Sequence, residues 1–232
     1  MTKRMLSMML ATIVALAMIA VPADGHAGSR TEKMTTYNKI VKRGNTVCVS
    51  LKDAIVAVNL KNGKTRILEN KTPTELLPGC GIKHMKIKGN YLYYIDVLGT
   101  DHWDTFFYRV NIKNGKKKRL GRDVLGYVIK GKKLYYLGHK IDWSNGGKDI
   151  KKNRVMKLNG KGKKKTSVKA KMKSKSSNAR GYSVVHSYSY TKNGYDAQYD
   201  VTDVISYHKY YLKKPNGKKV FLMTRGVVVD TY

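Results

Sequence analysis

The chain has 232 residues, of which 47 are basic and 15 acidic, so its formal charge is +32. This length suffices for one domain with a sizeable core. The charge favours anionic partners but does not select a fold, and lysines that only fill solvated turns and edge strands would give the same composition.

The N-terminal residues have the order of a secretory leader. Lys3 and Arg4 precede an uncharged, apolar run over residues 5–21, and small residues around Ala23 and Ala27 supply cleavage sites. The alternative is an uncleaved membrane anchor, for which the run is slightly short. We expect a signal peptide at 1–27, a linker at 28–36 and an exported domain at 37–232. No later stretch is long and apolar enough to span a membrane, so this domain is expected to be secreted or held non-covalently at the cell wall.

The chain has two cysteines, Cys48 and Cys80. Outside the cell such a pair favours a disulfide, which would close a loop of about 30 residues and contribute roughly 3–4 kcal/mol in the chain-entropy account. Two free, buried thiols are the alternative.

One short phrase, with Lys-Gly or Arg-Gly ahead of apolar and tyrosine residues, recurs along the chain. It is clearest at 87–94 and 129–136, is present at 41–49, and is faint at 180–185. Its glycines are Gly44, Gly89, Gly131 and Gly181. Their spacing of roughly 40–50 residues is close to one four-stranded propeller blade.

A second phrase follows each copy of the first. It is nearly identical at 58–64 and 110–116, with looser copies at 156–161 and 211–218. Asn-Gly between alternating apolar residues is a strong hairpin signal, because a type I′ turn needs positive φ at both central residues. Each repeat is therefore predicted to be two hairpins in series, with strands A to D.

Four repeats follow, at about 37–75, 82–121, 123–167 and 178–224. The basic stretch 161–177 is expected to pack poorly and to hold strand D of the third repeat. Residues 226–230 are interpreted as one more strand, which either closes the array or begins an incomplete blade. The predicted fold is all-β and β-propeller-like, with about four blades of four antiparallel strands, either closed or open.

The phrases Ile-Lys-Gly-x-x-Leu-Tyr-Tyr and Tyr-Arg-Val-x-x-x-x-Gly-Lys resemble the repeats of uncharacterised secreted proteins and lipoproteins of Gram-positive anaerobes, which are similar to TolB-type propellers. The resemblance covers residues 37–224. It implies a propeller architecture, usually of six or more blades, and brings no catalytic motif with it.

A candidate binding face follows from the predicted strand order. The tight A–B and C–D turns lie at one end of each blade, and the B–C and D–A connections at the other. The B–C connection lengthens from repeat to repeat, and such insertions usually mark a binding face. The candidate ligand-binding residues there are Asp101, His102, Trp103, Asp104, Asp142, Trp143, Tyr195 and Tyr199.

Aromatic rings beside carboxylates suit a carbohydrate surface or a cationic or peptide ligand. The alternative is that Trp103 and Trp143 cap the core between blades while the Asp residues make local turn hydrogen bonds.

Signals for catalysis and for bound groups are weak. Asp196, Asp200 and Asp203 lack the spacing of a known calcium loop, and no zinc motif is present. No nucleophile elbow, P-loop or dinucleotide fingerprint occurs. Neither a catalytic residue nor a metal nor a cofactor is therefore expected.

The sequence favours a secreted, non-enzymatic binding protein that engages an anionic cell-wall polymer, a polysaccharide or a protein ligand through one loop face. Nucleic acid is a weak candidate outside the cell. A glycan-active enzyme, which would need two carboxylates in one cleft, and a structural assembly module are the alternatives.

Overall fold

The computed structural model describes residues 29–34, 40–51, 54–71, 81–98, 104–169, 179–196 and 201–231. These form two compact units: residues 1–30, 187–208 and 225–232 belong to the first, and residues 31–186 and 209–224 to the second. The predicted signal peptide lies outside the described residues. No helix among the residues that the structure describes is both long and apolar enough to cross a membrane.

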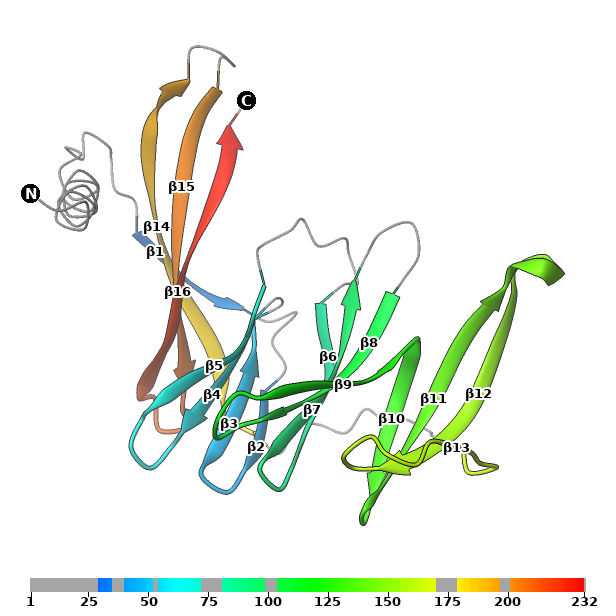
Figure 1. Cartoon of the computed structure of the whole chain (residues 1–232). Coiled ribbons are helices and arrows are strands. Elements are labelled where there is room, and N and C mark those ends of the chain that lie inside the picture. Colours follow the sequence, from blue (N-terminus) through cyan, green and yellow to red (C-terminus); the bar gives the residue numbers. More distant parts are fainter. Residues whose placement is uncertain are drawn as a thin grey trace, which may run out of the picture. The chain divides into compact units, whose positions relative to one another are not determined.

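The described strands form four antiparallel sheets of four strands each. Blade 1 contains β2 (Ile40–Arg43), β3 (Thr46–Ser50), β4 (Ala54–Asn59) and β5 (Thr65–Asn70). Blade 2 contains β6 (Gly81–Lys88), β7 (Tyr91–Leu98), β8 (Asp104–Asn111) and β9 (Lys117–Arg122). Blade 3 contains β10 (Val124–Lys130), β11 (Lys133–Asp142), β12 (Lys148–Lys157) and β13 (Lys164–Lys165), with the 3-10 turn η1 (Trp143–Asn145) between β11 and β12. The blades are coloured in chain order in Figure 1.

Blade 4 joins residues from opposite parts of the sequence. Its strand order is β1 (Ser29–Met34), β14 (Ser183–Asp196), β15 (Val201–Lys213) and β16 (Lys219–Thr231). Residues 28–36 were expected to be a linker, but most of them form β1, because pairing satisfies backbone groups that an edge strand would leave open. Residues 226–230 are not a separate strand, since they continue β16.

The predicted all-β, propeller-like architecture with four blades of four strands is confirmed. In blades 1 to 3 strands that follow one another in the chain are neighbours in the sheet. Their A–B and C–D turns are tight, and the turn glycines have positive φ, for example +54° at Gly44 and +60° at Gly89. An L-residue would be strained there, which explains why glycine recurs at each turn. In blade 3 strand D has only two residues, because the Lys-rich segment offers few apolar side chains to bury.

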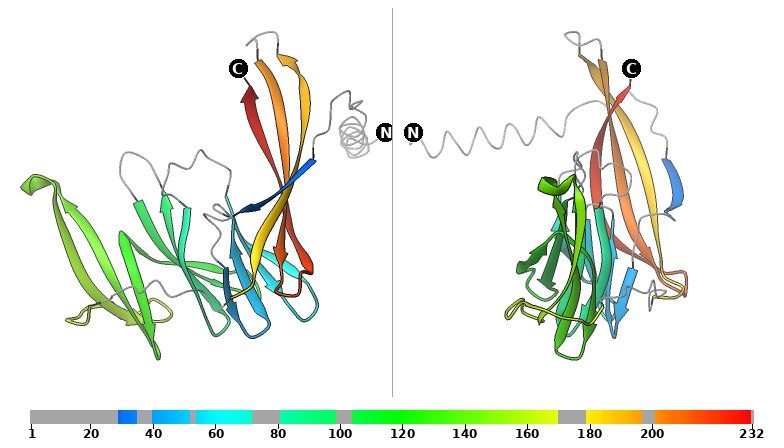
Figure 2. Two further views of the ribbon diagram at one scale, coloured as in Figure 1. Left: turned by 180° about the vertical axis from the view of Figure 1, so that it is seen from behind. Right: turned by 90° about the vertical axis from the view of Figure 1, so that its right-hand side faces the viewer.

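Three buried clusters join neighbouring blades within the second unit. Blade 1 packs on blade 4 through residues such as Val49, Val56 and Leu212. It packs on blade 2 through its other face, and blade 2 packs on blade 3. The strands of blades 1 and 2 lie beside one another in Figure 2 as well. No buried cluster of described residues joins blade 3 to blade 4.

Strand β7 explains how one blade serves two neighbours. All six of its inner residues are buried, because successive side chains point to opposite faces and both faces are covered. Leu92 and Tyr94 face blade 1, whereas Tyr93 and Ile95 face blade 3. Full burial of a side chain of this size contributes about 1.5–3 kcal/mol. The Leu-Tyr-Tyr phrase of β7 is therefore buried on two sheets, whereas in β11 only Leu134 and Tyr136 are buried, against blade 2.

Candidate functional site

Half of the eight binding residues predicted from the sequence lie outside the described part of the chain. Asp101, His102, Trp103 and Tyr199 are not described, and only the backbone of Trp143 and Tyr195 is placed, in η1 and β14. The side chains of Asp104 and Asp142 are described. The predicted grouping of all eight on one face therefore stays a prediction.

Asp142 organises the turn that follows β11. Its Oδ1 accepts a hydrogen bond from Ser144 Oγ at 2.6 Å, and its Oδ2 accepts one from Asn145 Nδ2 at 3.0 Å. These two hydrogen bonds, Ser144 first, hold the pKa of the carboxyl below its ordinary value. Such contacts are those of a local turn carboxylate.

Asp104 at the start of β8 pairs with Arg122 at the end of β9. One guanidinium nitrogen, NH2, lies 3.0 Å from Oδ1 and 3.1 Å from Oδ2 of Asp104. The hydrogen bond and charge of Asp104, with a contribution from Asp123, raise the pKa of Arg122. Arg122 also lies over the ring of Phe106, 5.8 Å from its centroid. The neighbouring strand β9 therefore holds this carboxylate in a local ion pair.

Cys48 lies in the core between blades 1 and 2. It is a free thiol in the structure, and burial raises its pKa to about 12. Cys80 lies outside the described residues, so the predicted disulfide is not tested.

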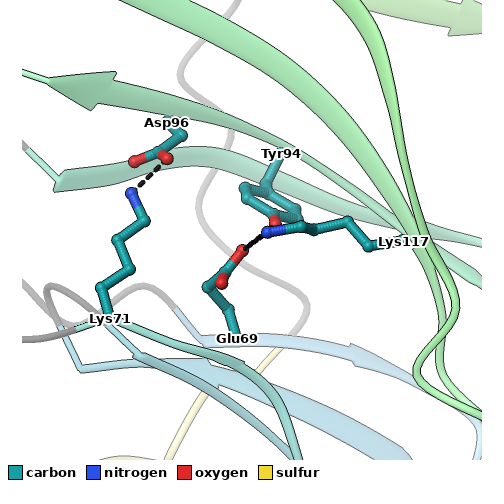
Figure 3. Close-up of polar contacts among 5 residues, drawn as sticks. All are labelled: Glu69, Lys71, Tyr94, Asp96 and Lys117. Atoms are coloured by element: carbon teal, nitrogen blue, oxygen red, sulfur yellow. Dashed lines mark hydrogen bonds and ion pairs between the residues drawn. The ribbon is translucent and has the colours of Figure 1, made fainter.

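The described part of the chain brings a different polar group together where blade 1 meets blade 2. Glu69 on β5 accepts hydrogen bonds from Tyr94 Oη on β7 and from Lys117 Nζ on β9, both at 2.6 Å. Nearby, Lys71 pairs with Asp96 of β7. Figure 3 shows the five residues as two adjoining groups.

The electrostatics of Glu69 follow from these partners. Burial alone would raise its pKa, but the hydrogen bonds from Lys117 and Tyr94 and the charges of Lys117 and Lys71 outweigh burial, and the pKa is lowered. Glu69 is therefore ionised at neutral pH. In turn, burial and the hydrogen bond to Glu69 raise the pKa of Tyr94 far above its ordinary value, so its hydroxyl stays protonated.

Asp96 is almost fully buried, with 2% of its surface exposed. Lys71 pairs with its Oδ2, and its Oδ1 has no hydrogen-bond partner among the described residues. A buried charge without its partner destabilises the folded protein, so the ion pair of Lys71 with Asp96 favours the contact between blades 1 and 2.

Aromatic rings complete the group around Glu69. Tyr94 stacks on Tyr108 with centroids 5.5 Å apart, and Lys117 Nζ lies 4.9 Å from the centre of the Tyr108 ring. The lysine is held by both a carboxylate and a ring. This arrangement fixes the boundary between two blades, and its ionised, lysine-paired carboxylate is a poor proton donor for acid catalysis.

A second feature is the charge on the two ends of the blades. We call the Gly-based A–B and C–D turns the turn end, and the B–C and D–A connections the loop end. Exposed basic side chains line the turn end: Arg43, Lys61, Lys64, Lys88, Lys113, Lys116, Lys130, Lys132, Lys133, Lys157, Lys161, Lys213 and Lys218. None of these forms an ion pair with a residue that the structure describes.

Acidic side chains lie toward the other end. Among the described residues of 40–186 and 209–224, each is in or beside a connection of the loop end, or on the half of a strand that leads to one. These residues are Glu69, Asp96, Asp104, Asp123 and Asp142, and the backbone of Asp149 has the same kind of position at the start of β12. Among the described residues, the acidic side chains therefore lie toward the loop end of the blades, and the turn end carries basic side chains without an acidic partner.

Neither feature is predicted as a site from the sequence. Glu69 is one of the few glutamates after the leader, but nothing in the sequence pairs it with Lys117, 48 positions away. The basic turns are visible in the repeated phrases, where Lys or Arg stands beside each Gly. No group of three or more His, Cys, Asp or Glu that could hold a metal occurs among the described residues.

No protein-family model matches the chain, and no curated protein matches its sequence. Solved structures do resemble it. The tricorn protease is 11% identical with a TM-score of 0.43, over 84% of this chain and 27% of that one. The AtxE2 isopeptidase is 11% identical with a TM-score of 0.39, over 87% and 46% of the two chains.

The N-terminal domain of Nup159 is 12% identical with a TM-score of 0.37, over 79% of this chain and 46% of that one. The chain thus spans less than half the length of these three proteins. At such TM-scores the likenesses carry no argument about activity, and the fold rests on the sheets described above.

Proposed function

We propose that this is a secreted, non-enzymatic binding protein that engages anionic polymers of the cell envelope. The observation that carries the proposal is the row of exposed basic side chains at the turn end, none of which forms an ion pair with a described residue, in a chain of net charge +32. The resemblance of its repeats to those of secreted TolB-like proteins of Gram-positive anaerobes supports the location.

The contacts of the acidic residues favour binding over catalysis. Glu69 and Asp96 are each held by a lysine, Asp104 by Arg122, and Asp142 by its own turn. A glycan-active enzyme would need one carboxylic acid with a raised pKa opposite a second carboxylate. The lowered pKa of Glu69 is the opposite of what the proton donor requires.

Binding to purified cell walls across a salt series tests the proposal. Electrostatic binding weakens as salt rises, because the ions screen exposed charges. We expect retention at low salt and release at high salt. Retention that is absent, or that does not change with salt, would contradict the proposal. Incubation of the protein with the same walls is expected to release no soluble sugars, because the proposed protein is not an enzyme.

Binding to a neutral polysaccharide tests whether the predicted loop face binds glycans. If the loop aromatics bind a glycan, the Trp103→Ala, Trp143→Ala variant loses that binding and keeps its fold, while salt has little effect on the wild type. If the variant fails to fold, the two rings belong to the core instead.

A further inference from the structure

We infer that the turn end of the blades is the docking surface for a linear polyanion, one that carries closely spaced negative charges along its length, and that the loop end contributes little. The inference rests on the proposed function and assigns it to a surface opposite the one that the loop lengths indicated.

Positive and negative side chains are separated along each blade. In blade 3 the A–B turn carries Lys130, Lys132 and Lys133, all exposed, whereas the B–C connection carries Asp142 and Asp149 beside its lysines. No Asp or Glu occurs in any of the Gly-based turns. An approaching polyanion therefore meets unopposed positive charge at the turn end, whereas at the loop end carboxylates offset part of the positive charge.

Contacts between turns place them at a common end of the second unit. Within blade 1, Leu60 N donates to Asn45 O at 2.7 Å, and within blade 2, Ile112 N donates to Asn90 O at 2.9 Å. Between blades 2 and 3, Lys118 Nζ lies 3.1 Å from Asn159 O. The two turns of blade 1 are therefore in contact, as are those of blade 2, and Lys118 of β9 reaches the C–D turn of blade 3. These turns lie at the lower end of the strands in Figure 1.

The turns hold their lysine backbones in fixed positions. Asn59 Oδ1 accepts a hydrogen bond from the amide of Lys61 at 3.0 Å, and Asn62 Oδ1 accepts one from Lys64 at 3.1 Å. Asn114 does the same for Lys116 at 3.0 Å. Since the backbone is ordered before binding, less entropy is lost when an anion docks.

The spacing of the turns selects a polymer over a small anion. Two turns of one blade are two strand spacings apart, about 10 Å, and packed sheets are also about 10 Å apart. A small anion would meet one lysine cluster, whereas a long chain spans several and binds by multivalency. Lysine is a point charge without the fork of arginine, so charge density is recognised rather than one group's shape.

The absence of apolar tips argues for a polymer rather than a membrane. The large apolar side chains that are exposed among the described residues are Ile67, Leu125, Val168, Tyr207 and Phe221. None of these lies at the tip of a Gly-based turn. Surfaces that lie in a bilayer interface usually insert apolar side chains.

Two triple variants of blade 3 test the assignment with equal loss of charge. The turn variant is Lys130→Gln, Lys132→Gln, Lys133→Gln, and the loop variant is Lys140→Gln, Lys148→Gln, Lys152→Gln. All six lysines are exposed. Binding of each full-length protein to long-chain inorganic polyphosphate is measured across a salt series, with tripolyphosphate as competitor and thermal unfolding as the folding control.

We expect the turn variant to bind at least about tenfold more weakly at 0.1 M salt and to show a salt slope lower by up to about three. The loop variant is expected to stay within about twofold of the wild type. Tripolyphosphate should compete poorly at equal phosphate concentration. If the turn variant unfolds, the pair Lys113→Gln, Lys116→Gln in blade 2 replaces it.

The outcomes separate this inference from the proposed function. A wild type that binds neither polyphosphate nor cell walls would overturn both. A wild type that binds polyphosphate, with equal losses in the turn and loop variants, would overturn the turn-end assignment alone. So would tight binding of tripolyphosphate, or binding to phosphatidylglycerol vesicles without binding to polyphosphate.

Discussion

The hydroxyl of Tyr94 donates to Oε2 of Glu69 over 2.6 Å, and this bond links β7 of blade 2 to β5 of blade 1. Both residues are also bound to others at the boundary. Tyr94 stacks on Tyr108, and Glu69 accepts a second hydrogen bond from Lys117. The boundary between the first two blades therefore depends on a charged network as well as on apolar packing.

Removing the Tyr94 hydroxyl should weaken this boundary. A hydrogen bond to a charged group contributes about 1.5–3 kcal/mol, so Tyr94→Phe is expected to lower the free energy of unfolding by that amount in urea denaturation. Tyr135→Phe is the control, because the Tyr135 side chain is only partly buried and lies on the face of blade 3 away from blade 2. Equal losses in both variants would contradict the role of the bond.

The network around Glu69 should also make the free energy of unfolding depend on pH. The pKa of Glu69 is lowered from its ordinary value of 4.5, so the native state binds this proton less readily than the unfolded chain does. The resulting stabilisation is complete above pH 4.5 and is lost as the pH falls through the native pKa.

The measurement is urea denaturation of wild type and Glu69→Gln at several pH values. The difference between them should be largest near neutral pH and should shrink below pH 4.5. A difference that is constant with pH would show that Glu69 acts through its shape rather than its charge.

Gly160 should tolerate alanine worse than the matching glycine of the preceding blade. Both have positive φ, +85° at Gly160 and +75° at Gly115. A Cβ at Gly160 would lie 2.9 Å from Cδ2 of buried Leu120, whereas one at Gly115 would meet nothing within 4 Å. Gly115→Ala should cost about 1–2 kcal/mol from backbone strain alone, and Gly160→Ala about 1 kcal/mol more from crowding. Thermal or urea unfolding of both variants gives the comparison, and equal costs would contradict the close approach.

Cys48 should be unreactive in the folded protein. Burial raises its pKa to about 12, and the thiolate is the reactive form. We expect iodoacetamide at pH 8 to leave Cys48 unmodified in the native state and to modify it fully in denaturant without reductant, as peptide mass spectrometry would show. Modification only after reduction would instead establish the disulfide with Cys80 that the sequence predicts.

Local chemistry explains why the repeat architecture could be predicted. The turn glycines have positive φ, which few other residues adopt, so their recurrence indicates the hairpins directly. The Asn before each glycine of the C–D turns does not have positive φ, so these turns are not the type I′ turns that the sequence predicts. Alternating apolar residues, as in β8, then identify the strands. Blade 4 was less predictable, because the pairing of β1 with β14 depends on an open sheet edge and not on a pattern within residues 29–34.

The candidate site shows the same division. The Lys or Arg beside each turn glycine is visible in the sequence. Because successive strands run in opposite directions, the sequence also places these residues at one end of each blade. The group of Glu69, Lys117 and Tyr94 was not foreseen, since it joins strands from two blades whose packing no local phrase encodes.

By itself, the sequence determined the four repeats, the turns and the placement of positive charge on those turns, because each depends on the backbone preferences of a few neighbouring residues. The tertiary structure decided which blade faces lie together, which acids are neutralised by lysine, and that the first described strand completes the last blade. Those outcomes depend on the burial and pairing of groups far apart in the chain, where the free energy belongs to the contact and not to either segment alone.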